Sequence, residues 1–214
     1  MNSATTRVLS ALVLLPLLIA LIWWAPSTLF ALVLLVALAI GVTELRRLVS
    51  NPVLFLALSA IYLAVPLSLL QVIRSDFGPG ALMAMIGLIV ISDSAQYYTG
   101  RAFGRHKLAP VISPKKTVEG AVGGAVFGTI AGVAFAHYWV PAMPMVWAAV
   151  MSLLMSIAGM AGDLFESAMK RRVGLKDSGN LIPGHGGILD RIDSWLFAAP
   201  VFWAFLKLFA QAGQ

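Results

Sequence analysis

The chain contains no cysteine, and only 11% of its 214 residues are charged. The absence of cysteine excludes disulfide bonds, thiolate metal sites and cysteine nucleophiles. Patterns of the GxSxG, GxxxxGK(S/T) and GxGxxG types are absent as well. This removes the usual sequence indications of a serine hydrolase, a P-loop enzyme or a Rossmann nucleotide-binding protein. The few charged side chains are therefore the first place to look for a functional site.

Hydrophobic residues make up 60% of the chain, and its mean hydropathy of +0.91 lies outside the range of soluble globular domains. We therefore predict an all-α, polytopic integral membrane helix bundle that forms a single domain over residues 1–214. Because each crossing needs about 20 residues, the chain has room for about seven spans and no separate soluble domain. Proline and glycine interrupt the apolar runs, which places the expected spans at 8–24, 29–42, 53–73, 81–98, 118–138, 145–169 and 188–209.

The basic residues favour one orientation of this bundle. All but two of the 15 Lys and Arg residues lie around positions 7, 44–51, 99–117, 170–187 and 191. Cytoplasmic loops carry the excess of Lys and Arg, so we predict a cytoplasmic N-terminus and an external C-terminus. The same placement of Lys and Arg explains the isoelectric point near 10.0, because these residues set the membrane topology and contact anionic lipid. Nucleic acid is not expected as a partner.

Residues 167–193 concentrate charge and glycine in a chain that is otherwise mostly apolar. Four bases precede a PGHGG turn: Lys170, Arg171, Arg172 and Lys176. Because glycine lacks a Cβ atom, the backbone amides of such a turn, including those of Gly186 and Gly187, can approach an anion closely. Asp190 and Asp193 follow at a spacing that puts both carboxylates on the first turn of a helix. Together these groups suit a metal-bound polyphosphate.

Three further carboxylates, those of Asp93, Asp163 and Glu166, lie inside predicted spans. A charge there costs about 2.5–3.5 kcal/mol even on the permissive insertion scale, so pairing or metal binding is expected. Asp163 and Glu166 end one span on the cytoplasmic side, and Asp190 and Asp193 begin the next span from that side. Four carboxylates directed at one region could hold one or two Mg²⁺ ions on phosphate oxygens. The alternative is salt bridging to the neighbouring arginines.

A second polar cluster precedes the fifth expected span. Ser113, Lys115, Lys116 and Thr117 could bind phosphate there, or the lysines could be a positive-inside anchor. Thr117 and Glu119 also favour the start of a helix at this point.

Two further features have structural interpretations. Gly120, Gly124, Gly128 and Gly132 recur every four residues and predict a smooth stripe for close helix packing. In the PGHGG turn, His185 could donate to a phosphate or stabilise the turn. The spacing of the histidines does not fit a zinc site.

Two segments together match the pattern of one enzyme family. The first follows S-x-x-K-R-x4-K-D…P-G-H-G-G-x-x-D-R-x-D through Ser167, Lys170, Arg171, Lys176, Asp177, Pro183, His185, Gly186, Gly187, Asp190, Arg191 and Asp193. The second, residues 93–120, follows DxxAYxxGRxFGxHKLAPxISPKKTxEG, with Gln96 in place of alanine. From about residue 81 to 209 the chain thus resembles the phosphatidate cytidylyltransferases, the CDP-diacylglycerol synthases. Between its second and third expected spans it is shorter than many members.

The resemblance implies transfer of CMP from CTP to phosphatidic acid at the cytoplasmic face of a bacterial inner membrane, with a divalent metal. It implies Mg²⁺ binding by Asp163, Asp190 and Asp193, and it is compatible with an additional monovalent cation and with a homodimer. Neutralisation of the two polyanionic substrates would fall to Lys170, Arg171 and Lys176 as well as the metal. The residues expected to bind substrate are Ser113, Lys115, Lys116, Thr117, His185, Gly186, Gly187 and Arg191.

Other functions fit parts of the sequence. Recognition of a lipid tail leaves no motif in a sequence. The acceptor of the nucleotidyl or phosphoryl group could therefore be another lipid, such as one of the polyprenol type. Intramembrane carboxylates and bases also occur in anion transporters, although no internal repeat supports that function. A purely structural membrane subunit would leave the phosphate-binding chemistry of residues 167–193 without a use.

Overall fold

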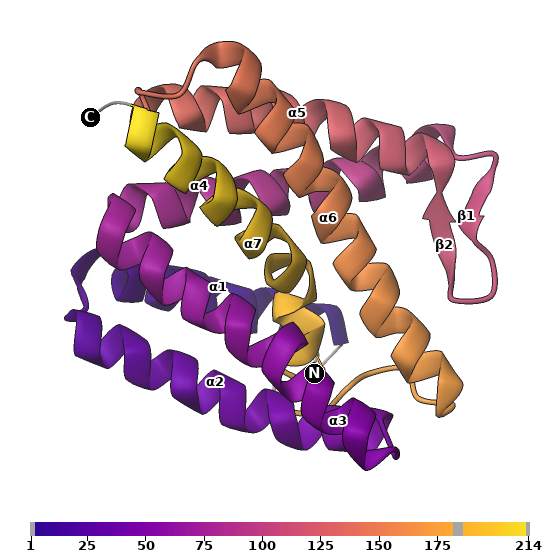
Figure 1. The fold of residues 1–214 in the computed structure, drawn as a ribbon. Coiled ribbons are helices and arrows are strands. Elements are labelled where there is room, and N and C mark those ends of the chain that lie inside the picture. Colours follow the sequence, from indigo (N-terminus) through magenta and orange to yellow (C-terminus); the bar gives the residue numbers. More distant parts are fainter. Residues whose placement is uncertain (1–2, 182–185, 213–214) are drawn as a thin grey trace.

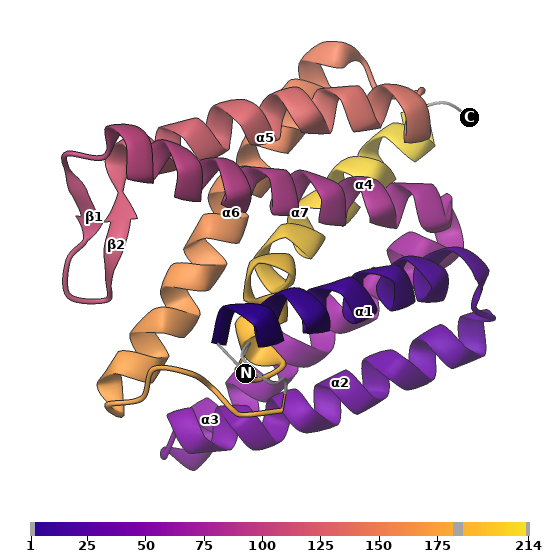
Figure 2. The same ribbon diagram turned by 180° about the vertical axis from the view of Figure 1, so that it is seen from behind.

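The computed structural model describes residues 3–181 and 186–212. Its elements are α1 (Ser3–Trp24), α2 (Ser27–Leu48), α3 (Pro52–Leu58), the π-helix η1 (Ser59–Ala64), α4 (Val65–Phe103), β1 (Lys107–Ala109), β2 (Ser113–Thr117), α5 (Val118–Trp139), α6 (Met145–Arg172) and α7 (Leu189–Ala212). The helical, membrane-like class predicted from the sequence is confirmed, with one short hairpin added. In both ribbon views α2 and α5 lie on opposite sides of the molecule, with α7 between them (Figures 1 and 2).

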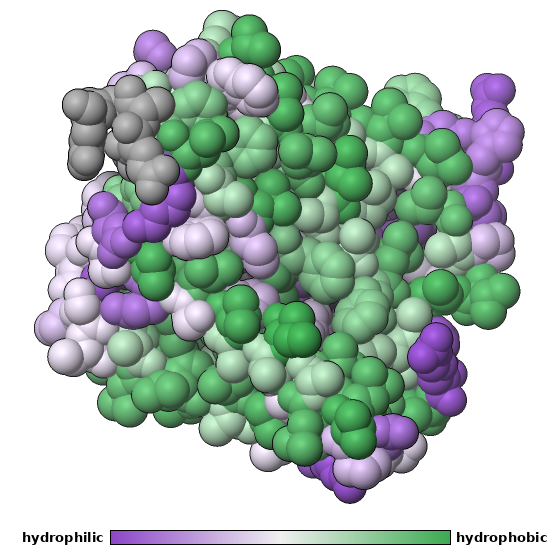
Figure 3. Space-filling view, in the orientation of Figure 1, coloured by the Kyte–Doolittle hydropathy of each residue, from purple (hydrophilic) through white to green (hydrophobic). Residues whose placement is uncertain are grey.

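Among the residues that the structure describes, five helices are long and apolar enough to cross a membrane: Ser27–Leu48, Pro52–Phe103, Val118–Trp139, Met145–Arg172 and Leu189–Phe209. A shorter apolar helix covers Leu12–Trp24. Hydrophobic residues dominate the middle of the face in Figure 3, while hydrophilic residues gather toward its edges, including the hairpin edge. This surface is typical of a membrane protein. The count of about seven spans and the orientation stay predictions.

The 52-residue helical stretch Pro52–Phe103 is not straight. Gly78 has φ +87° and ψ 165° and interrupts α4, and Pro79 follows it. A positive φ suits glycine because it has no Cβ atom. The chain turns here, so that α4 consists of two limbs (Figure 1). The break predicted between spans 53–73 and 81–98 is thereby confirmed.

One expected loop is helical instead. The apolar run predicts a second span that ends at residue 42 and a loop over 44–51, whereas α2 continues to Leu48. Glu44 and Leu45 are buried in this last part of α2. The apolar run ends before the helix does, because backbone hydrogen bonding continues through residues that are no longer hydrophobic.

The hairpin connects α4 to α5. Lys107 pairs with Thr117 and Ala109 with Ser113 in antiparallel register. Thr117 is the N-cap of α5, as its residue type predicts: its Oγ1 accepts from Gly120 N at 3.1 Å. The carboxylate of Glu119 accepts from the backbone amide of His106 at 3.2 Å, which ties the start of the hairpin to the start of α5.

The predicted glycine stripe packs against other helices. Gly120, Gly124, Gly128 and Gly132 are all buried on α5. A Cβ atom added to Gly124 would lie 2.9 Å from the backbone oxygen of Ser92 on α4. The packing role of the stripe is therefore confirmed, because no larger side chain fits without separating α4 from α5.

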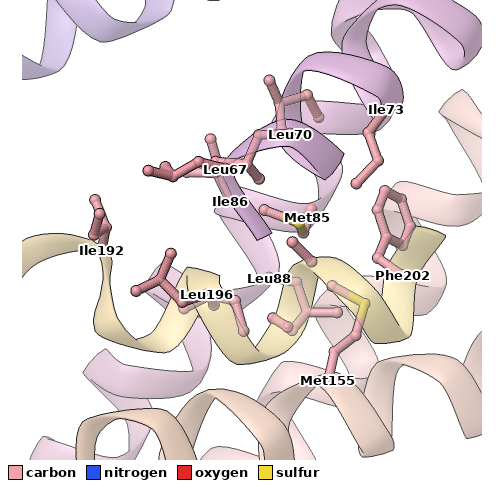
Figure 4. Packing of buried hydrophobic residues seen from close by; sticks show 14 of the residues in the cluster. Leu67, Leu70, Ile73, Met85, Ile86, Leu88, Met155, Ile192, Leu196 and Phe202 are labelled. Carbon is pink, nitrogen blue, oxygen red and sulfur yellow. The ribbon is translucent and has the colours of Figure 1, made fainter. Parts of the chain in front are cut away.

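The core lies among the limbs of α4, α6 and α7. Figure 4 shows buried side chains from these helices converging: Leu67, Leu70, Ile73, Met85, Ile86, Leu88, Met155, Ile192, Leu196 and Phe202. Their packing fixes how α6 and α7 lie against α4, and therefore where the polar ends of these helices meet.

Candidate active site

The predicted polar clusters meet in one cavity of about 920 Å³. Its walls come from the second limb of α4, the hairpin, α5, the end of α6 and the start of α7. Its charged lining residues are Asp93, Arg101, Lys107, Lys115, Lys116, Asp163, Glu166, Lys170, Asp177, Asp190, Arg191 and Asp193. The cavity therefore unites carboxylates and bases from segments far apart in the chain, in a protein with few charges.

Lys116 links the hairpin to α6. Its Nζ lies 2.6 Å from Asp163 Oδ2, and the hydroxyl of Ser167 donates to the other Asp163 oxygen at 3.2 Å. The Asp163 side chain is 34% exposed, whereas the Nζ atom of Lys116 is buried beneath it. Lys116 is thus a cation at the site wall rather than only a charge near the membrane surface.

Lys170 forms a second ion-pair cluster deeper in the site. Its Nζ lies 2.7 Å from Glu166 Oε2 and 2.5 Å from Asp190 Oδ1. Lys170 is 7% exposed and Glu166 is fully buried. A buried charge is tolerated when it is paired and hydrogen-bonded. Lys170 therefore joins the end of α6 to the start of α7 by compensating two carboxylates.

Asp190 is held by the loop that precedes α7. Its Oδ2 accepts from the Ser178 amide and hydroxyl, both at 2.9 Å, and from the Gly187 amide at 2.8 Å. Gly186 has φ +85°, and a Cβ atom there would lie 2.5 Å from Asp190 Oδ2. Glycine at this position is explained both by the backbone conformation and by the close carboxylate.

Asp93 and Asp193 face the same cavity from α4 and α7. Asp193 Oδ1 accepts from Ser194 N at 2.8 Å, and Asp93 accepts from the Gln96 side chain at 3.1 Å and the Ser194 hydroxyl at 3.5 Å. Within 3–181 and 186–212, neither carboxylate forms an ion pair. In this part of the chain Asp193 Oδ2 accepts no hydrogen bond, whereas each oxygen of Asp93 accepts one.

Residues 50–209, three quarters of the chain, match the model of the cytidylyltransferase family. The chain belongs to the cytidylyltransferase family. The predicted resemblance is confirmed. Named relatives include the phosphatidate cytidylyltransferase of Bacillus subtilis, 40% identical over 73% of this chain and 59% of that protein. That of Brucella suis is 43% identical over 66% of this chain and 53% of its own length. The chain thus spans little more than half of these relatives.

The structure does not bring every predicted site residue of this chain to the cavity. Arg171 and Lys176 are exposed and do not line it. The Arg171 side chain donates to the carbonyl oxygens of Ile112 at 3.2 Å and Leu175 at 2.8 Å, which joins the hairpin loop to the end of α6. His185 lies outside the described residues. The roles predicted for these three side chains stay predictions.

The remaining predicted residues are at or beside the cavity. Those that line it are Ser113, Lys115, Lys116, Thr117, Asp163, Lys170, Asp190, Arg191 and Asp193. Gly186 and Gly187 contribute backbone beside Asp190. Thr117 uses its hydroxyl oxygen as the cap of α5.

The predicted metal ligands differ in how well they fit a cation. In the described part of the chain, no three Asp, Glu or His side chains are arranged as a ready metal cluster. Asp190 is occupied on both oxygens, by Lys170 and by three other donors. Asp163 accepts from two donors, Lys116 and Ser167, whereas Asp193 accepts from Ser194 N and has no ion pair among the described residues. Carboxylate oxygens suit Mg²⁺, so Asp163 and Asp193 fit this ion better than Asp190.

Sequence reasoning missed Glu44 and gave no site role to Asp93. Asp93 was noticed as a charge inside a span, and the structure places it in the cavity wall. Glu44 was assigned to a loop with Arg46 and Arg47, but it is only 3% exposed. The available signal was an acidic residue two positions after the end of an apolar run. This signal does not indicate which segment the carboxylate contacts.

Proposed function

We propose that this chain transfers the CMP group of CTP to phosphatidic acid, which forms CDP-diacylglycerol and releases pyrophosphate. The observation that carries the proposal is the cavity in which Lys116 and Lys170 lie with six carboxylates in a bundle of apolar helices. Relatives named phosphatidate cytidylyltransferase, at 40% and 43% identity, support CTP and phosphatidic acid as the substrates.

The chemistry explains why such a site needs charge more than a base. An oxygen of the phosphatidate phosphate attacks the α-phosphorus of CTP, and the bond between that phosphorus and the pyrophosphate oxygen breaks. A phosphate monoester with a second pKa of about 6 is already largely deprotonated at neutral pH. The attack therefore requires no dedicated general base. The larger task is to hold two polyanions in line and suppress their repulsion.

The cavity residues divide this task. Ser113, Lys115 and Lys116 bind phosphate from the hairpin side. Asp163 and Asp193 would hold a divalent cation, for which Mg²⁺ is the expected ion. Such a cation would supply positive charge to the phosphate oxygens.

On the opposite side of the site, Lys170 and Arg191 contribute positive charge, and Lys170 also holds Asp190 in place. Arg171 and Lys176, which are exposed near the end of α6, add to the positive potential that attracts the nucleotide.

The location of the cavity suits one soluble and one membrane-held substrate. Its lining includes apolar side chains of α4 and α7, among them Ile89, Val90 and Trp195, next to the charged groups. We propose that this polar end faces the cytoplasm, where CTP is available, and that the apolar wall accommodates the start of the acyl chains. The concentration of Lys and Arg in the segments at this end supports the orientation.

The direct test is conversion of radiolabelled CTP by the purified chain in phosphatidic acid micelles with Mg²⁺. Thin-layer chromatography should show labelled CDP-diacylglycerol, and pyrophosphate should appear in equal amount. Asp193→Asn is the matched control, because it removes a carboxylate charge with little change in volume and should abolish turnover. An active Asp193→Asn variant would contradict the role of Asp193.

A change of acceptor lipid and a transport assay separate the alternatives. Turnover with a polyprenyl phosphate but not with phosphatidic acid would show that the acceptor is a polyprenyl lipid. Movement of labelled phosphate into proteoliposomes without any CTP turnover would indicate that the chain is a transporter and not an enzyme.

A further inference from the structure

Glu44 lies at the end of α2, yet its carboxylate contacts the loop between α6 and α7. Its Oε2 accepts from the Ser178 hydroxyl at 3.1 Å and from Leu189 N at 2.9 Å. Its Oε1 accepts from Ile188 N at 3.0 Å. These partners are more than 130 residues away in sequence. The contact therefore joins the first part of the chain to the segment that carries Asp190.

Two glycines fit around this carboxylate. A Cβ atom added to Gly179 would lie 2.5 Å from Glu44 Oε1, and one added to Gly187 would lie 2.4 Å from the same oxygen. Both distances are too short for any side chain. Gly179 is near the middle of the α6–α7 loop and Gly187 is near its end. Glu44 thus contacts the middle of the loop and its end at the same time.

The charge of Glu44 is compensated by backbone dipoles. Among the ion pairs of the described residues none includes Glu44, although the residue is 3% exposed. Its partners Ile188 N and Leu189 N are amides at the N-terminus of α7, which carries partial positive charge. A buried carboxylate with these donors is stable, and donors left without it would be unsatisfied.

Ser178 connects Glu44 to Asp190. Its hydroxyl lies 3.1 Å from Glu44 Oε2 and 2.9 Å from Asp190 Oδ2. A hydroxyl has one proton, so it donates to one carboxylate at a time. The Ser178 and Gly187 amides donate to Asp190, while the next two amides donate to Glu44. The two carboxylates therefore share one set of loop donors, and the position of one affects the other.

From these contacts we propose that Glu44 is a positioning residue, which sets the α6–α7 loop so that Asp190 lies against Lys170 in the active site. Glu44 precedes residue 50, where the match to the family model begins. The α2 helix would then be part of the catalytic apparatus rather than only a membrane anchor. The consequence for catalysis rests on the proposed function, whereas the effect on the loop does not.

The test compares Glu44→Gln with Thr43→Ala in purified chains. Thr43 is the exposed neighbour of Glu44, and its hydroxyl bonds only to Ile40 O, within its own helix. Glutamine keeps the volume of Glu44 but replaces one carboxylate oxygen with an NH₂ group, which donates and cannot accept. The donors that met that oxygen therefore lose their acceptor, and the remaining oxygen carries no charge. Hydrogen–deuterium exchange of residues 186–196 and turnover of CTP are both measured.

We expect exchange in residues 186–196 of Glu44→Gln to accelerate about tenfold or more, with residues 118–139 unchanged, because hydrogen bonds to a charged acceptor are lost locally. The turnover number should fall about tenfold or more while KM for CTP stays within about threefold, since Asp190 is displaced without loss of the phosphate-binding lysines. Thr43→Ala should match the wild type in both measurements.

A second variant, Ser178→Ala, keeps the hydrogen bonds from α7 to Glu44 and removes only the shared hydroxyl. It tests the proposal if Glu44→Gln does not fold. It should lower the turnover number while KM for CTP is retained. The proposal would be overturned if Glu44→Gln matched the wild type in both hydrogen exchange and turnover. It would also be overturned if Ser178→Ala turned over CTP as fast as the wild type. Faster exchange throughout Glu44→Gln would also overturn it, because the role would then be general stability. If the wild type itself makes no CDP-diacylglycerol, the proposed function fails, and the exchange comparison still decides whether Glu44 holds the loop.

Discussion

Replacing Lys170 with methionine should destabilise the protein strongly. Lys170 Nζ lies 2.7 Å from Glu166 and 2.5 Å from Asp190, and Glu166 is completely buried. Methionine has a similar length and no charge, so the variant leaves Glu166 without its cation. Breaking a buried ion pair by removing one partner costs about 3–5 kcal/mol. At roughly 2–4 °C per kcal/mol for a chain of this size, the unfolding midpoint should fall by about 6–20 °C.

The measurement is thermal unfolding in detergent, followed by the fluorescence of the six tryptophans. The double variant Glu166→Gln/Lys170→Met is the informative comparison. It removes the buried charge together with its partner and should recover most of the lost stability. Activity should not return, because Asp190 would still lack the cation that holds it.

A midpoint for Lys170→Met within about 2 °C of the wild type would refute this reasoning, since it would place the cost of the unpaired carboxylate below about 1 kcal/mol. Equal instability of the single and double variants would refute it differently. In that case the packing of the lysine stem, rather than its charge, would be the source of the stability.

Three other predictions follow from the same geometry. Gly124→Leu should lower thermal stability in detergent, because a Cβ atom there would already lie 2.2 Å from Gln96 Cγ; an unchanged midpoint would argue against the close packing of α4 and α5. Lys116→Gln should reduce kcat/KM for CTP about tenfold or more, whereas Arg47→Gln, which removes an exposed charge outside the cavity, should have little effect. Equal minor losses in both variants would make Lys116 a topological charge only. A cysteine at Val111, which is 85% exposed in the hairpin loop, should react with an impermeant thiol reagent only from the cytoplasmic side, and external labelling would reverse the proposed orientation.

Much of the helical framework follows from local sequence features. The apolar runs indicate membrane helices because burial of hydrocarbon in lipid depends on composition and length, which are properties of the segment itself. The break at Gly78, the cap at Thr117 and the stripe on α5 are local in the same sense. Helix ends are less readable, as α2 shows: its last turn carries Glu44, Arg46 and Arg47, and hydropathy declines before the backbone hydrogen bonds end.

The residue types of the site, and the family to which they point, were determined by the sequence alone. Only the tertiary structure decided which charges meet. Lys116 pairs with Asp163 across 47 positions, Lys170 joins Asp190 of the next helix, and Glu44 holds a loop more than 130 residues away. No local pattern specifies such pairs, because a buried carboxylate can be compensated by a lysine, a metal ion or backbone amides at similar cost. The packing of α2, α6 and α7 selects among these partners by placing one of them within hydrogen-bonding distance.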